Sequence, residues 1–269
     1  MTILVTGATG TVGRHVVDQL LKKGVKVRTI SRNPEKADLP AGVEVVAGDL
    51  AIPESLEAAL QGVTALHLLA SSYNFQTDPK VVEMAERAGV KRVSVLVSDT
   101  EGPVEEALAN SGMEWTLLKP VEFMSNAIVD WQESIRLEGV VREPFGNALS
   151  AKVHEADIAS VSVVALLKSG HHGQSYYLTG PEAITRIESV QIISKILGRE
   201  IRFEELTEEQ ARQNWRDQGY EEGDIEFFVA MGKNPPEVGY TVLSTVEQVT
   251  GKPARTFAEW ASEHKSYFV

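Results

Sequence analysis

Residues 6–13 read TGATGTVG, with Gly7, Gly10 and Gly13 at a regular spacing of three. The stretch follows the apolar run 3–5 (ILV) directly, and a helical pattern of apolar residues follows over 12–22. Glycine is a poor former of helices and strands. Three glycines at one junction therefore indicate that the backbone there must be free of side chains. The stretch is therefore predicted to connect a first strand to a first helix.

The same alternation continues outward through the first 120 residues. Strands are predicted at Thr2–Thr6, Val25–Ile30, Val43–Val46, Thr64–Leu69, Val93–Val97 and Trp115–Leu118, and helices at Val12–Lys22, Pro53–Leu60, Pro79–Ala88 and Val104–Asn110. Strands and helices that alternate at this spacing predict a parallel sheet with helices on both faces. The nearly continuous apolar strands agree with burial of both faces. The predicted fold class is α/β, a Rossmann-type doubly wound parallel sheet with a smaller, mostly helical C-terminal lobe.

The pattern changes after Pro120. One helix is predicted at Val121–Leu137 and an apolar helix at Ala156–Leu167. Three threonines, each followed three residues later by Glu or Gln, form capping boxes that predict three more helix starts at Thr185, Thr207 and Thr256. The predicted Rossmann domain consists of residues 1–120 plus returning segments around 150–180. The smaller substrate-binding lobe consists of 121–150 and 181–269.

Composition limits the class of protein. The chain has 269 residues, a formal net charge of −12 and no cysteine. An acidic surface disfavours non-specific binding to nucleic acid, and the lack of cysteine excludes disulfides and thiolate metal sites. The six histidines show no spacing typical of a metal site. No signal peptide or membrane-spanning run is recognised, so we expect a cytoplasmic protein that does not bind membranes. We also expect a monomer or homodimer that binds no metal and no nucleic acid.

The glycine stretch is predicted to bind a nucleotide phosphate. Free N–H groups at a helix N-terminus carry partial positive charge and bind anions. We expect Gly7 to make the turn, Gly10 to lie against the pyrophosphate and Gly13 to let the helix pack close to the sheet. The other residues predicted to contact the cofactor in this stretch are Thr9, Thr11 and Val12. A tight turn that binds no ligand is the alternative interpretation.

The end of the second predicted strand indicates which dinucleotide binds. An NAD site usually has Asp or Glu there, which bonds to the 2′-hydroxyl of the ribose. This chain instead has Ser31 and Arg32, and a guanidinium suits a 2′-phosphate. The predicted cofactor is therefore NADP(H), preferred over NAD(H). In the alternative interpretation, Arg32 is solvated or stacks on the adenine.

Four stretches together resemble the NmrA-like branch of the atypical short-chain dehydrogenase/reductases. They are TGATGTVG, SRNPEKA at 31–37, VEVVAGDL at 43–50 and TGKPARTFAEW at 250–260, and the likeness covers nearly the whole chain. The resemblance implies cofactor contacts at Asp49, Leu50, Leu69, Ala70 and Ser71. It also implies that the segment after Lys119 borders the nicotinamide and the substrate. The group includes NADPH-dependent quinone reductases and non-catalytic NADP sensors.

The sequence departs from ordinary short-chain dehydrogenases at the proton donor. Those enzymes use Tyr-x-x-x-Lys, and no tyrosine here has a lysine four residues later. Lys119 and Ser98 end predicted strands and are the remaining candidates for catalytic residues. The alternative for Lys119 is a snorkelling or ion-paired lysine, and the alternative for Ser98 is a helix cap.

A substrate pocket is predicted from Phe123, Asn126, Trp131 and His154, with the two aromatic rings forming a wall for a flat substrate. Packing in the core is the alternative for both rings. The predicted function is an NADPH-dependent oxidoreductase that transfers a hydride to a flat conjugated acceptor such as a quinone. Two alternatives stay open: a non-catalytic NADP-binding redox sensor that signals to a protein partner, and an enzyme of the same fold that tailors an aromatic natural product without net redox.

Overall fold

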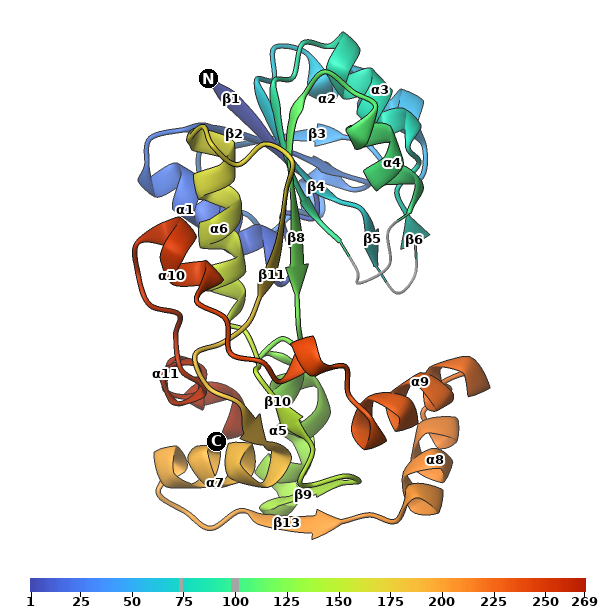
Figure 1. Cartoon of the computed structure of the whole chain (residues 1–269), viewed down its shortest axis with the longest axis vertical. Helices are drawn as coiled ribbons and strands as arrows, with labels where there is room; N and C mark the ends of the chain where they lie inside the picture. Colours follow the sequence, from blue (N-terminus) through green and yellow to red (C-terminus); the bar gives the residue numbers. More distant parts are fainter. Residues whose placement is uncertain (73–74, 98–101) are drawn as a thin grey trace. The chain divides into compact units, whose positions relative to one another are not determined.

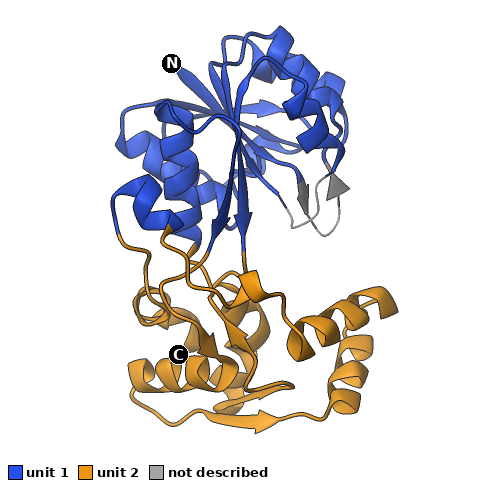
Figure 2. Cartoon of the chain, viewed as in Figure 1, with its two compact units in different colours: residues 1–120, 155–178, 245–252 blue, residues 121–154, 179–244, 253–269 orange. Residues whose placement is uncertain are grey.

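The structure is a computed structural model that describes residues 1–72, 75–97 and 102–269 (Figure 1). The chain divides into two compact units (Figure 2). Unit 1 is Met1–Pro120, Glu155–Leu178 and Thr245–Lys252, and unit 2 is Val121–His154, Thr179–Ser244 and Pro253–Val269. The predicted division into a Rossmann domain and a smaller substrate-binding lobe stays a prediction.

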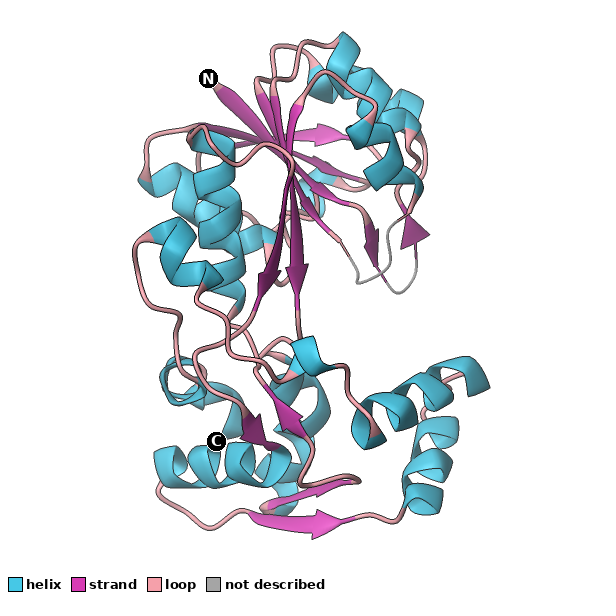
Figure 3. Ribbon diagram, in the orientation of Figure 1, coloured by secondary structure: helices cyan, strands magenta, loops and turns pink. Residues whose placement is uncertain are grey.

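Unit 1 is built on a seven-stranded parallel sheet with the order β11-β8-β7-β4-β1-β2-β3 (Figure 3). The strands are β1 Thr2–Val5, β2 Lys26–Ser31, β3 Val43–Ala47, β4 Ala65–Leu69, β7 Arg92–Leu96, β8 Glu114–Pro120 and β11 Gln174–Leu178. The order of the strands reverses between β1 and β4, and dinucleotides bind at the carboxyl ends of the strands at such a point. The predicted α/β fold class is confirmed.

Helices cover both faces of this sheet (Figure 1). They are α1 Gly13–Lys22, α2 Glu57–Leu60 after the 3₁₀ turn η2 Pro53–Leu56, α3 Lys80–Arg87, α4 Pro103–Ala109, α6 Glu155–Leu167 and α10 Thr245–Thr250. A short hairpin of β5 Ser71–Ser72 and β6 Phe75–Gln76 follows β4. Helix α6 is buried almost all round because it packs on α1, α10 and the sheet.

A buried polar network joins the sheet to α6. The Nδ1 atom of His67 in β4 lies 3.0 Å from Ser94 Oγ in β7 and 2.8 Å from Ser162 Oγ in α6. The two hydroxyl oxygens are 2.7 Å apart, so each polar group has a partner inside the core. Burial lowers the pKa of His67 to about 4.

His67 should make the free energy of unfolding depend on pH. Between about pH 6.5 and pH 4 the imidazole of His67 binds a proton in the unfolded chain but not in the folded chain. The free energy of unfolding therefore falls as the pH is lowered through this range. We expect wild type to lose about 2–3 kcal/mol more than His67→Asn between pH 7 and pH 4.5. Urea unfolding at both pH values measures the difference; parallel losses would contradict a neutral His67.

Unit 2 combines helices with two small sheets. Its elements are α5 Asn126–Glu138, β9 Val140–Glu143, β10 Leu149–Ser150, β12 Ile184–Thr185, α7 Arg186–Leu197, β13 Arg202–Glu205, α8 Glu208–Asp217, α9 Glu222–Lys233, η3 Glu237–Gly239, α11 Phe257–Glu263 and η4 Lys265–Phe268. Strand β9 pairs with β13 in parallel, and β10 pairs with β12 antiparallel. The three predicted capping boxes cap α7, α8 and α11.

The first helix of unit 2 starts later than predicted. We predicted a helix from Val121, whereas α5 begins at Asn126. Phe123 instead forms a parallel bridge with Val153. The N–H of Met124 donates to the carbonyl of Val153, whose own N–H donates to Glu122. These bonds satisfy the backbone in an extended conformation, so a helix does not form there.

Candidate functional site

The candidate cofactor site of unit 1 begins where β1 and β4 diverge. The hydroxyl of Thr6 donates to the carbonyl of His67 at 3.1 Å and accepts from the N–H of Leu69 at 2.8 Å. These bonds tie the start of the glycine stretch to the end of the neighbouring strand. Gly7 follows with φ +62°, a left-handed conformation that side chains disfavour.

Neither of the other two glycines has a positive φ, and only Gly13 is required for space. The carbonyl of Gly7 accepts from the N–H of Gly10 at 2.9 Å. A Cβ atom on Gly13 would overlap that same carbonyl oxygen, so the helix can approach the turn only without a side chain. A Cβ atom on Gly10 would lie 3.1 Å from it, and Gly10 is exposed. The loop is thus closed at Gly13 and open at Gly10.

The N-terminus of α1 has the features of an anion site. Within the described residues, no carbonyl or side chain accepts from the N–H groups of Thr11, Val12 or Gly13. The helix has no side-chain cap and no acidic residue in its first turn. Uncapped N–H groups and the helix dipole favour a negative group, so this geometry fits a pyrophosphate. Thr9 and Thr11 are both exposed beside it.

Ser31 and Arg32 lie at the carboxyl end of β2, on the same edge of the sheet. The Ser31 hydroxyl accepts from the N–H of Asn33 at 3.1 Å. Arg32 is exposed, and nothing in the described part of the chain pairs with its guanidinium. A cation without an internal partner at this edge is available to a ligand phosphate.

The remaining predicted cofactor residues follow β3 and β4. The Asp49 carboxylate accepts from the N–H of Ala51 at 3.0 Å, which fixes the turn after β3, and Leu50 beside it is buried. The Leu69 side chain lies against Gly7, since a Cβ atom there would be 3.3 Å from Leu69 Cδ2. Ala70 is buried and Ser71 opens β5. The fold brings all these backbone positions to one sheet edge, although their roles stay predictions.

The structure describes one of the two candidate catalytic residues, Lys119. Lys119, near the end of β8, is 8% exposed, and its Nζ lies 5.7 Å from the ring centroid of Tyr177, its register partner on β11. This cation–π contact stabilises the charge of a nearly buried lysine, and the catalytic role of Lys119 stays a prediction. Ser98 lies outside the described residues.

The four residues predicted for the substrate pocket belong to unit 2. Phe123 is half-buried and Asn126 is exposed. Trp131 is 4% exposed, and its Nε1 donates to Glu143 Oε1 at 3.2 Å. His154 is fully buried, with Nε2 3.3 Å from Glu263 Oε2. Trp131 and His154 are thus packed in the interior of unit 2, and the predicted aromatic wall stays a prediction.

Unit 2 also contains a charged cluster that the sequence did not reveal. Lys152, nearly buried, pairs with Glu122, and Arg186 lies 3.7 Å from Glu143. These residues are far apart in the sequence, so no local motif could have predicted that they meet.

Two further kinds of site are absent from the described residues. No group of three or more His, Cys, Asp or Glu side chains there could hold a metal ion. In the same residues, no helix is long and apolar enough to cross a membrane.

Proteins similar to this chain in sequence and structure include several that bind or use a nicotinamide cofactor. A family profile described as NAD(P)H-binding matches residues 7–169. A (4-alkanoyl-5-oxo-2,5-dihydrofuran-3-yl)methyl phosphate reductase from Streptomyces griseus subsp. griseus is 38% identical, with 99% of each chain covered. An NAD(P)H azoreductase from Xenophilus azovorans is 35% identical, again over 99% of each chain. The crystal structure of an NADPH-dependent quinone oxidoreductase from Escherichia coli, complexed with NADPH, has a TM-score of 0.82 at 27% identity, covering 98% of this chain and 99% of that chain.

Proposed function

The chain belongs to the NAD(P)H-binding family, and on this premise we propose that it is an NADPH-dependent oxidoreductase that transfers a hydride to a flat conjugated acceptor such as a quinone. The resemblance to NmrA-like atypical short-chain reductases is confirmed by these relatives. The observation that carries the proposal is the uncapped N-terminus of α1 beside the closed glycine turn.

The residues of unit 1 suit a dinucleotide. The free N–H groups of Thr11, Val12 and Gly13 would hold the pyrophosphate, and the exposed Gly10 leaves room for it. Bound NADPH supplies the hydride, and the protein supplies position and electrostatics. We propose that Arg32 binds the 2′-phosphate, which would make NADPH the preferred cofactor over NADH. This preference is supported by the Arg32 guanidinium, with which no group among the described residues pairs, and by the absence of Asp or Glu at the end of β2.

The acceptor class follows from the relatives' chemistry. Their names specify a quinone, an azo group and an alkanoyl-substituted oxo-dihydrofuran. All three are conjugated, electron-poor systems that can accept a hydride and delocalise the resulting charge. Such a reaction depends more on positioning and on stabilising a developing oxyanion or nitrogen anion than on a strong general base. The absence of a Tyr-x-x-x-Lys pair from the sequence is compatible with this chemistry.

Lys119 provides a test of how the proton is supplied. We expect Lys119→Met to keep kcat within about threefold, because the lysine packs on Tyr177 and water can protonate a reduced quinone. A protein acid contributes about 100-fold or more, so a fall of that size would identify Lys119 as the proton donor. Steady-state assays at saturating NADPH measure kcat, and thermal unfolding of the variant controls for lost packing.

The proposed function is tested by following NADPH consumption at the nicotinamide absorbance with a panel of quinones and an azo dye. NADH at the same concentration serves as the comparison. Turnover that requires both NADPH and acceptor supports the reductase. Binding of NADPH in a calorimetric titration without turnover of any acceptor in the panel would instead favour the redox-sensor or non-redox alternative.

A further inference from the structure

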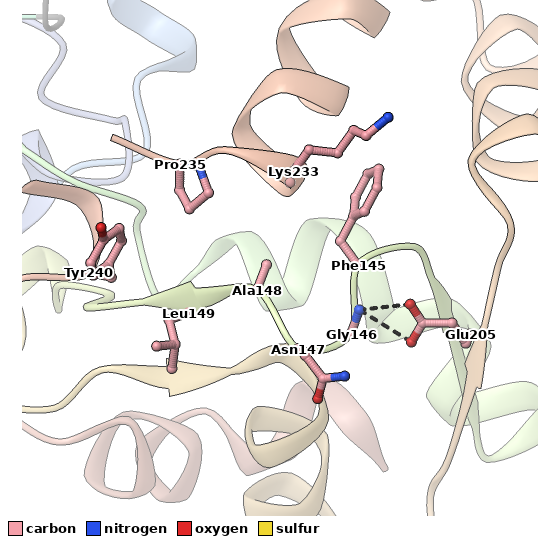
Figure 4. Close-up of a pocket in the computed structure, with 10 residues that line it drawn as sticks. Phe145, Gly146, Asn147, Ala148, Leu149, Glu205, Lys233, Pro235 and Tyr240 are labelled. Atoms are coloured by element: carbon pink, nitrogen blue, oxygen red, sulfur yellow. Dashed lines mark hydrogen bonds between the residues drawn. The ribbon is translucent and has the colours of Figure 1, made fainter. Parts of the chain in front are cut away.

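A second concave site lies wholly within unit 2. It has a volume of about 450 Å³, within the range typical of small-molecule sites. One side is formed by the loop before β10 and by β10 itself, and the other by the end of α9 and the chain that follows it (Figure 4). None of the four residues predicted from the sequence for a substrate pocket lines it. It therefore needs its own explanation.

The loop that forms this pocket has an unusual backbone. Phe145 has φ +57°, the left-handed region that bulky residues avoid. The carboxylate of Glu205 holds the loop by accepting from the N–H of Gly146 at 3.0 and 3.2 Å. The N–H of Ala148 closes the turn on the carbonyl of Phe145 at 2.9 Å. Neighbouring groups thus fix a strained conformation, as is common at ligand sites.

The shape of the pocket suits a flat ring. Phe145 lies against Gly232 so closely that a Cβ atom at position 232 would overlap the aromatic ring. Pro235 and Tyr240 add two more flat groups, and the small side chain of Ala148 also lines the pocket (Figure 4). Aromatic rings and proline present broad apolar surfaces, and aromatic pairs stack with a favourable energy beyond area burial.

The charges around the pocket disfavour an anion. Glu205 contributes a carboxylate, and the C-terminus of α9 directs partial negative charge toward Gly232 and Lys233. Lys233 is the one cation among the lining residues, and its Nζ is already 2.8 Å from the carboxylate of Glu208. A phosphate would have to compete with that carboxylate and approach a second one.

We infer that the pocket walled by Phe145, Pro235 and Tyr240 binds an uncharged, flat conjugated ring and discriminates against phosphate esters of the same ring. The inference rests on the proposed function only for the identity of the ring, a quinone. It also separates this chain from its 38% identical relative, whose named substrate is a phosphate ester.

The first experiment fills the pocket. Calorimetric titration of the full chain with 1,4-naphthoquinone, without NADPH, should show binding that Ala148→Phe weakens more than about tenfold, because the new ring occupies the ligand's space. Ala258→Phe is the matched control, since Ala258 is exposed on α11 outside the pocket. Tyr240→Ala, at a partly exposed position, should weaken binding about fivefold by removing a stacking surface. Unchanged affinity in both pocket variants, or no binding to wild type, would overturn the inference.

The second experiment tests whether the pocket binds a neutral ring more tightly than the phosphate ester of the same ring. 1-Naphthol should bind at least about tenfold more tightly than 1-naphthyl phosphate, because only the phosphate meets the carboxylates. Equal affinities, or a preference for the phosphate, would overturn the discrimination.

Turnover assays keep this inference apart from the proposed function. If wild type reduces the quinone and Ala148→Phe has the same KM, the pocket inference fails and the reductase stands. If wild type binds the quinone but never oxidises NADPH, and Ala148→Phe abolishes that binding, the pocket stands and the reductase fails.

Discussion

A Gly10→Val variant is expected to bind NADPH more than about 100-fold more weakly than wild type while keeping its fold. The valine would place a branched side chain on the exposed side of the glycine turn, two residues before the N-terminus of α1, where we propose that the pyrophosphate binds. Two charge-assisted bonds to phosphate are worth about 3–6 kcal/mol together, and each 1.4 kcal/mol is a factor of ten in Kd. Calorimetric titration measures the loss.

The fold should survive this change because Gly10 is exposed and only the carbonyl oxygen of Gly7, 3.1 Å away, lies close to a new Cβ atom. Circular dichroism and the thermal midpoint check this. Gly223→Val in α9 is the matched control, since nothing lies within 4 Å of a Cβ atom there. Wild-type affinity in Gly10→Val would remove the glycine stretch as the phosphate site.

Replacing Arg32 with alanine is expected to separate the two nicotinamide cofactors. If the guanidinium binds the 2′-phosphate, Arg32→Ala loses at least one charge-assisted hydrogen bond worth about 1.5–3 kcal/mol, or roughly 10- to 100-fold in NADPH affinity. NADH has no 2′-phosphate, so its affinity should change by less than about twofold. The ratio of the two dissociation constants is therefore the measurement.

A second surface cation controls for a general electrostatic effect. Lys36 lies in the 3₁₀ turn Pro34–Lys36 after β2 and is exposed, as Arg32 is. Lys36→Ala should alter NADPH and NADH binding slightly and equally, because exposed charges are largely screened by salt. An equal loss for both cofactors in Arg32→Ala would rule out Arg32 as the group that reads the 2′-phosphate.

The two variants test different parts of the proposal. Gly10→Val tests whether a dinucleotide binds at the end of β1 at all. Arg32→Ala tests only the preference for NADP(H). Loss of binding in the first with unchanged preference in the second would support the dinucleotide site and would assign the cofactor preference to groups other than Arg32.

The sequence determined those features whose physical cause is local. The strand, glycine turn and helix around TGATGTVG follow from residues within one stretch, because tight turns and helix N-termini are set by neighbours in the chain. The capping boxes at Thr185, Thr207 and Thr256 were predicted for the same reason. The parallel sheet followed from the repeated alternation of such local units.

Tertiary structure decided what depends on residues distant in sequence. Helix α5 starts at Asn126 because Val153, far along the chain, bonds to the backbone before it. The sequence around Trp131 is compatible with a ring in a pocket wall or with a ring in the core, and only the packing of the folded chain distinguishes these two positions. The pocket of unit 2 unites the loop at Phe145 with Tyr240, about a hundred positions apart, and no periodicity encodes such a meeting. Side chains acquire partners, burial and shifted pKa values only when the chain is folded. For that reason the glycine turn could be predicted from the sequence and the pocket of unit 2 could not.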